Sequence, residues 1–204
     1  ETDPPQVNMI VLEPLSAEPF ILRARSDLEN LYERKLHDLD FALKLSPDDA
    51  QAHWLRARIL KDTGQYFAAL ESIRKAVQLD EEHGRYRLTW VSVLLETGDY
   101  ERAVREVKRV IISNKHAPEV RAQAMLLAGN LILAETNPDY GEAIKFHQEA
   151  VKLTAPLVTD ERVDVRRTAK RLLIEAHLAI AQDIALGNWK RKQQVVPTWL
   201  RRAD

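Results

Sequence analysis

A block of small, aromatic and apolar residues occurs twice in this chain, and every matching pair is 34 residues apart. The pairs are Gly64 and Gly98, Tyr66 and Tyr100, Ala69 and Ala103, Ile73 and Val107, Ala76 and Val110, and Val77 and Ile111. A unit of this size is too small to enclose a core of its own, so it buries its apolar face against its neighbours. The period therefore predicts a row of stacked units.

Weaker copies of this block extend the row in both directions. One step towards the N-terminus, Tyr66 falls on Tyr32. Towards the C-terminus, Tyr140 begins another copy, and Trp189 stands in the tyrosine place of a degenerate last one. We expect an extended segment at 1–15, four repeats within 16–157 (about 16–49, 50–83, 84–121 and 122–157), and C-terminal capping helices or a degenerate fifth repeat at 158–204.

The spacing of apolar residues inside the block is that of a helix. Between Ala69 and Val77 they lie three and four residues apart, which places them on one buried stripe. Ala57, Ala69 and Ala103 are small because two helices cross there, and a larger side chain would force the helices apart at a cost of about 1–3 kcal/mol. Gly64 is expected to end one helix in the left-handed backbone conformation that glycine tolerates.

The step of 34 residues, with small residues and an aromatic at set places, resembles the tetratricopeptide repeat family. The resemblance covers 16–157 well and 160–189 weakly, and its residues are Ala57, Gly64, Tyr66, Ala69, Ala76, Leu79, Gly98, Tyr100 and Ala103, with Pro47 closing the first unit. It implies an all-α protein, a right-handed α-solenoid of about four helix hairpins plus a C-terminal capping helix. In such a stack we expect Tyr66 and Tyr100 to fill the space between hairpins.

The pattern also predicts individual helices. They are expected at 17–28, 31–45, 49–63, 66–80, 84–97, 100–114, 118–135, 139–155 and 160–187, followed by a stretch near 189–203 that Pro197 interrupts. In the C-terminal cover, the residues expected to face inward are Leu172, Leu173, Leu178 and Ile180, and those expected to face outward are Arg166, Arg167, Lys170 and Arg171.

Charge is distributed unevenly along the chain, although its net charge is −1. Residues 1–49 carry five Lys/Arg against eleven Asp/Glu, and residues 160–204 carry ten against six. The segments Trp189–Lys192 and Trp199–Arg202 mix cations with aromatics, which suits either a nucleic acid or membrane surface or a capping helix whose aromatics pack inward. We favour the capping helix, because no global charge attracts nucleic acid.

The residue types that carry chemistry do not form a recognisable site. The chain has no cysteine, and no two of its six histidines lie four residues apart on a helix. Ser72 and Lys75 match Ser-x-x-Lys, but the companion motifs of serine acylating enzymes are missing. Six scattered glycines do not form a phosphate loop. We expect no catalytic residue, no metal site, no cofactor, and hence no enzyme.

The resemblance implies that the first helix of each hairpin lines a concave groove that binds a peptide. The expected groove residues are Arg25, Gln51, Trp54, Arg58, Lys61, Arg85, Leu88, Ser92 and Asn130, and helical spacing adds Ile21, Asp62, Glu96, Gln123 and Leu126. Arg25 and Arg58 occupy equivalent places and suit a carboxylate; alternatively they pair with acidic residues of the next repeat, and Trp54 is interior. Because Arg58 and Ser92 replace the asparagine expected in family members that clamp a C-terminal carboxylate, we do not expect that ligand.

These observations predict a non-enzymatic scaffold or adaptor for a protein or peptide. A docking or regulatory module of a larger enzyme or secretion machine remains an alternative, and a nucleic-acid or membrane binder through the basic end is less favoured. We expect no small-molecule substrate, and membrane contact only through an N-terminal anchor missing from this sequence, since position 1 is Glu. The apolar run Asn8–Leu12 is expected to pack along the repeats, with the groove as one place for it.

Overall fold

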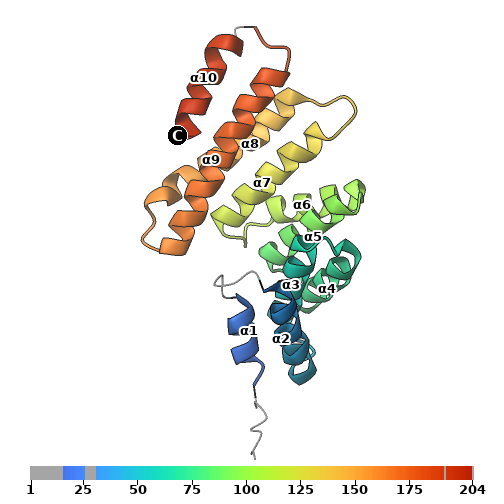
Figure 1. Ribbon diagram of the computed structural model, residues 1–204. Helices are drawn as coiled ribbons and strands as arrows, with labels where there is room; N and C mark the ends of the chain where they lie inside the picture. Colours follow the sequence, from blue (N-terminus) through green and yellow to red (C-terminus); the bar gives the residue numbers. More distant parts are fainter. Residues whose placement is uncertain (1–15, 26–30, 191, 204) are drawn as a thin grey trace, which may run out of the picture.

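The chain forms a stack of helices that runs from α1 at one end to α9 and α10 at the other (Figure 1). The computed structural model describes residues 16–25, 31–190 and 192–203, and all regular structure in these ranges is helical. The elements are α1 (Glu18–Arg25), α2 (Tyr32–Leu45), α3 (Ala50–Asp62), α4 (Tyr66–Leu79), α5 (Gly84–Glu96), α6 (Tyr100–Ile112), α7 (Pro118–Leu133), α8 (Tyr140–Thr154), the 3-10 turn η1 (Ala155–Thr159), α9 (Val163–Leu186) and α10 (Lys192–Ala203). The predicted all-α solenoid is confirmed.

Each of the repeated tyrosines opens the second helix of a hairpin. Tyr32, Tyr66, Tyr100 and Tyr140 are the first residues of α2, α4, α6 and α8. The repeat pattern therefore corresponds to a real structural period. The expectation that Tyr100 fills the space between hairpins is wrong, because 52% of this side chain is exposed. A residue at a helix start lies at the edge of the layer, where neighbouring helices cover only part of its ring.

The glycines between paired helices make the same turn twice. Gly64 and Gly98 have φ angles of 76° and 77°. After α3, the amide of Gln65 donates to the carbonyl oxygen of Leu60 at 2.8 Å, and the corresponding bond after α5 is 2.9 Å long. This bond and the left-handed glycine form a Schellman motif, which satisfies carbonyls that the helix leaves unpaired. The turn thus sets the angle at which each chain reverses.

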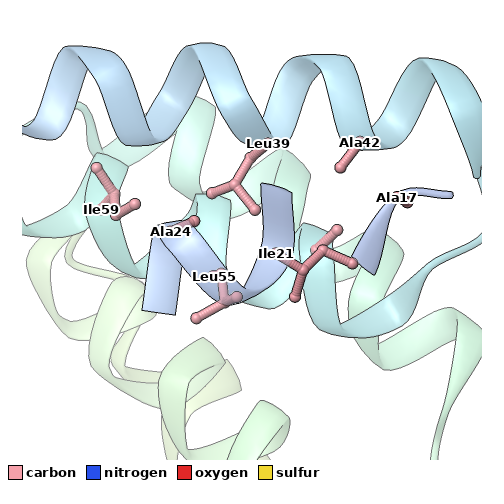
Figure 2. Packing of buried hydrophobic residues seen from close by; sticks show 8 residues of the cluster. Ala17, Ile21, Ala24, Leu39, Ala42, Leu55 and Ile59 are labelled. Carbon is pink, nitrogen blue, oxygen red and sulfur yellow. The ribbon is translucent and has the colours of Figure 1, made fainter. Parts of the chain in front are cut away.

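The interior is divided into small clusters that each join neighbouring helices. Ala57, Ala69, Ala76 and Ala103 are fully buried, as predicted for crossing points. In the first hairpin, α1 buries its apolar stripe against α2 and α3 through side chains shown in Figure 2; those labelled are Ala17, Ile21, Ala24, Leu39, Ala42, Leu55 and Ile59. Continuous burial from one cluster to the next replaces a single central core.

The C-terminal cover consists of α9 and α10. Leu172 and Ile180 on α9 are fully buried, as expected, but Leu178 is 46% exposed, so its predicted inward orientation is wrong. Leu178 and Ile180 are two residues apart, and at 3.6 residues per turn they lie on nearly opposite sides of a helix. Only one of them can therefore face the stack.

The predicted interruption at Pro197 is also wrong, because α10 continues through it. Proline removes one backbone hydrogen bond from a helix interior. Contacts with α9 oppose that loss: His177 Nδ1 donates to the carbonyl oxygen of Arg202 at 2.9 Å, and its ring lies 5.6 Å from that of Trp199. Packing on α9 stabilises a helix that its own sequence does not favour.

A buried polar pair joins α8 to α9. His147 Nδ1 donates to Asp183 Oδ2 at 2.7 Å, and both side chains are fully buried. Gly129 on α7 makes room for the histidine, since a Cβ at that position would come within 2.2 Å of His147 Nε2. Three successive helices therefore meet at one point where neither volume nor polarity is free to change.

We predict that Gly129→Ala lowers the free energy of unfolding by about 1–3 kcal/mol, because the new methyl group overlaps a histidine that its aspartate partner holds in place. Urea denaturation followed by circular dichroism measures the change. Asn130→Ala, at the next and exposed position of α7, is the control and is expected to stay within about 0.5 kcal/mol of the unmodified chain. Equal stability of the two variants would contradict the close packing at Gly129.

Candidate functional site

The first helices of successive hairpins line two adjoining hollows of about 570 and 260 Å³. Trp54, Arg58, Asp62 and Arg85 belong to both, so the hollows are continuous. We refer to them together as the concave groove. Its lining residues are Ala24, Arg25, Tyr32, Lys35, Gln51, Trp54, Leu55, Arg58, Ile59, Lys61, Asp62, His83, Arg85, Tyr86, Leu88, Thr89, Ser92 and Gln123.

Most residues that the sequence assigned to a groove lie along this lining. Of the main set, those in the concave groove are Arg25, Gln51, Trp54, Arg58, Lys61, Arg85, Leu88 and Ser92, and Asp62 and Gln123 join them. Asn130 is exposed on α7 but lies outside the lining, as does Glu96 on α5. Ile21 and Leu126 are buried in hydrophobic clusters. The first two repeats and the third therefore supply nearly all of this surface.

Trp54 is held in the middle of the concave groove by contacts on three sides. Its Nε1 donates to Thr89 Oγ1 at 2.8 Å, and its ring lies 5.5 Å from that of Tyr86. The same side chain packs against two hydrophobic clusters, one on either side of α3. Trp54 is thus both a packing residue and part of the groove wall, because only one of its faces is covered.

Arg58 stacks on this tryptophan, with its Cζ 5.0 Å from the ring centroid. The side chain is exposed, and it makes no ion pair within the described ranges. A guanidinium placed over an indole is attracted by the ring and is partly ordered before any ligand arrives. Its hydrogen-bond donors stay directed to the open side of the concave groove, where an acceptor is expected.

Cations outnumber anions along the concave groove. Its lining contains Arg25, Lys35, Arg58, Lys61 and Arg85, but only one carboxylate. That carboxylate, on Asp62, is 3.1 Å from Lys61, and Arg85 approaches Glu119 of α7 at 3.7 Å. Since the whole chain has a net charge of −1, this surface differs in sign from the average of the molecule. Local positive charge on a concave surface attracts acidic ligands.

Sequence reasoning missed five residues of the lining. They are Tyr32, Lys35, His83, Tyr86 and Thr89. Tyr32 and Lys35 belong to α2, a second helix, which the family resemblance does not assign to the groove. Thr89 follows Trp54 by 35 residues, close to one repeat, and that spacing was an available signal for it. Nothing local in the sequence marks Tyr86 as a partner for the tryptophan.

The floor of the concave groove contains a stacked histidine and tyrosine. The rings of His83 and Tyr86 are nearly parallel, with centroids 3.6 Å apart. Burial lowers the pKa of His83 below its usual value, and the neighbouring Asp80 opposes this only in part. Burial likewise raises the pKa of Tyr86. Both effects keep the two rings neutral, so the positive charge of the groove comes from its lysines and arginines.

We predict that acidification destabilises this floor. Because the pKa of His83 is lower in the folded than in the unfolded chain, the unfolded chain takes up the proton first. Its contribution to stability is complete above a pH of about 6.5, the usual histidine pKa, and is lost as the pH falls towards the lowered folded value. The free energy of unfolding should therefore decrease between about pH 7.5 and 5.5, and His83→Gln should make that decrease shallower. Urea denaturation at several pH values tests this; Asn130→Ala, which keeps every histidine, is the control, and identical slopes in all three chains would contradict it.

Two other candidate chemistries are not assembled in the described part of the chain. Ser72 donates from Oγ to the carbonyl oxygen of Ala68 at 3.0 Å and accepts from Arg56, and Lys75 lies 3.4 Å from Asp48. The Ser-x-x-Lys match is therefore a pair of structural contacts. No group of three potential metal ligands occurs among the described residues. None of the helices described is long and apolar enough to cross a bilayer.

Comparison with known proteins identifies the repeated unit. Models described as "Tetratricopeptide repeat" match residues 50–83 and 88–156, which together make up about half of the chain. No curated protein matches the chain in sequence.

Solved structures of similar shape are tetratricopeptide-type stacks with low sequence identity. MamA from Desulfovibrio magneticus RS-1 is 18% identical, with 92% of each chain covered and a TM-score of 0.64. PilF from Pseudomonas aeruginosa is 17% identical over 90% of this chain and 88% of its own, with a TM-score of 0.60. YrrB, described as a TPR protein with an unusual peptide-binding site, is 19% identical over 93% and 85%, with a TM-score of 0.56. At such identities the likeness establishes the fold alone.

Proposed function

The chain belongs to the tetratricopeptide repeat family, and from that premise we propose that it binds an extended acidic stretch of a partner protein in the concave groove. Proteins with these repeats are in general interaction scaffolds that bind proteins or peptides. The family therefore indicates the kind of function. The chemistry of the concave groove is what narrows it to one class of ligand.

The arrangement of Arg58 over Trp54 carries this proposal. A side chain that already lies on the indole loses little conformational freedom when it binds, and ordering a flexible side chain at an interface otherwise costs about 0.5–1.5 kcal/mol. The Trp54–Thr89 hydrogen bond keeps the platform in place. A carboxylate of the partner meets the guanidinium, and the uncovered part of the indole is available to an apolar side chain beside it.

The remaining charges extend this recognition along the concave groove. Arg25 and Arg58 come from neighbouring repeats, and Arg85 belongs to the next one. A ligand that lies across α1, α3 and α5 therefore meets one arginine from each helix. Arginine pairs well with carboxylates because its donors form a fork. The similarity to YrrB adds support, since that protein is described as having a peptide-binding site.

We also propose that the chain acts by binding and does not itself catalyse a reaction. The conspicuous buried acid–base pair, His147 and Asp183, is fully covered and lies between α8 and α9, away from the concave groove. Ser72 and Lys75 are occupied by structural contacts. The same groove serves a free-standing adaptor or a docking module of a larger protein.

We predict that a peptide selected from a random displayed library on the unmodified chain is rich in Asp and Glu. Its affinity should decrease at least about tenfold in Arg58→Glu, because an attractive charge becomes a repulsive one at the centre of the interface. Trp54→Ala should weaken binding as well, since it removes the platform and the apolar surface together. Fluorescence anisotropy with the labelled peptide, at two salt concentrations, measures these changes.

The matched control is Arg74→Glu, which makes the same change of charge on α4 at a residue outside the groove lining. It should leave the peptide affinity unchanged. Circular dichroism of each variant establishes that its fold is kept. Selected peptides that bind Arg58→Glu and the unmodified chain equally well would refute the proposed function.

A further inference from the structure

A second concavity lies at the other end of the molecule, where α8, α9 and the start of α10 meet. It has a volume of about 440 Å³, and nearly all of its surface is apolar. Ile144, Ile184, Trp189 and Val195 line it. We call it the C-terminal hollow. Trp189 is 42% exposed and Val195 is 39% exposed, so a substantial apolar surface faces solvent here.

Three lysines surround the C-terminal hollow. Lys192 donates from Nζ to the carbonyl oxygen of Ala185 at 3.0 Å and so caps α9. Lys145 and Lys190 are exposed and make no ion pair within the described ranges. No acidic side chain lines the hollow to neutralise them. An apolar floor with cations at its edge is complementary to a short apolar segment that carries carboxylates at its ends.

Residues 1–15 of this chain have that composition. They contain no Lys or Arg, and their three acidic residues, Glu1, Asp3 and Glu13, lie on either side of the apolar run Met9–Leu12. Their placement lies outside the described residues. We propose that the C-terminal hollow receives residues 1–15 of a second copy of this chain, the apolar run covering Trp189 and its neighbours while the carboxylates meet Lys145 and Lys190.

The occupant comes from a second copy because of the position of the two ends. In Figure 1, α1 lies at one end of the stack and the turn between α9 and α10 at the other. Donor segment and acceptor hollow are different surfaces, so the contact is heterologous, and each bound copy still offers one free end. Head-to-tail chains of molecules are the result. The concave groove takes no part in this contact and stays available to its own ligand.

A membrane surface fits the same lysines less well. Proteins that lie on a bilayer insert an apolar face or projecting aromatics among the lipid headgroups, whereas the apolar residues here line a concave space. A hollow of this size accommodates one or two large side chains of a peptide. Anionic vesicles therefore belong in the experiment as the competing outcome.

The experiment uses the full chain and a labelled synthetic peptide with the sequence of residues 1–15. Sedimentation velocity over a range of protein concentrations should show self-association, and excess peptide should reverse it. Lys145→Glu combined with Lys190→Glu should abolish self-association and weaken the peptide at least about tenfold, because both contacts become repulsive. A peptide with Met9→Asp and Ile10→Asp should not bind. Raised salt should weaken binding of the unmodified peptide.

Control variants separate this contact from the proposed function. Lys108→Glu combined with Lys170→Glu makes the same charge change at two exposed lysines outside the C-terminal hollow, and should leave self-association intact. Arg58→Glu should retain the peptide while losing the acidic ligands of the concave groove. Loss of the peptide in Arg58→Glu alone would place residues 1–15 in that groove and overturn the inference. A chain that stays monomeric and ignores the peptide, or that uses Lys145 and Lys190 only to bind phosphatidylserine vesicles, would overturn it as well.

Discussion

The close approach of paired helices at buried alanines is the constraint on which the rest of this structure depends. Ala57, Ala69, Ala76 and Ala103 are fully buried where helices cross, and the left-handed turns at Gly64 and Gly98 return the chain at the same angle each time. Larger side chains at these crossings would separate the layers. A constant crossing then gives a constant curvature, and curvature creates the concave surface.

The concave groove combines rigidity and charge in a small area. Trp54 is fixed by Thr89, Tyr86 and two hydrophobic clusters, and Arg58 is ordered on top of it. The neutral His83–Tyr86 stack beneath them leaves the charge of the site to flexible cations at the surface. A scaffold of this kind supplies affinity by ordering its contact groups before the ligand arrives.

The C-terminal part of the stack is built differently. The buried His147–Asp183 pair joins α8 to α9, Gly129 admits the histidine ring, and α10 is attached through His177. These contacts hold three elements around an apolar hollow that no residue of the described chain fills. The two concavities differ in chemistry, one polar and arginine-rich and the other apolar with lysines at its edge, so they are suited to different ligands.

Sequence alone determined the elements and their order. A step of 34 residues with glycines at the turns and tyrosines at the starts of second helices specifies paired helices, because local backbone preference and helical spacing act over short distances. It also located Trp54 and Arg58, since equivalent positions recur in each repeat. Tertiary structure alone decided that Tyr86, Thr89 and Lys35 join them, that α10 continues through Pro197, and that His147 meets Asp183. Each of these outcomes depends on contacts between residues far apart in the chain, whose energies no local pattern encodes.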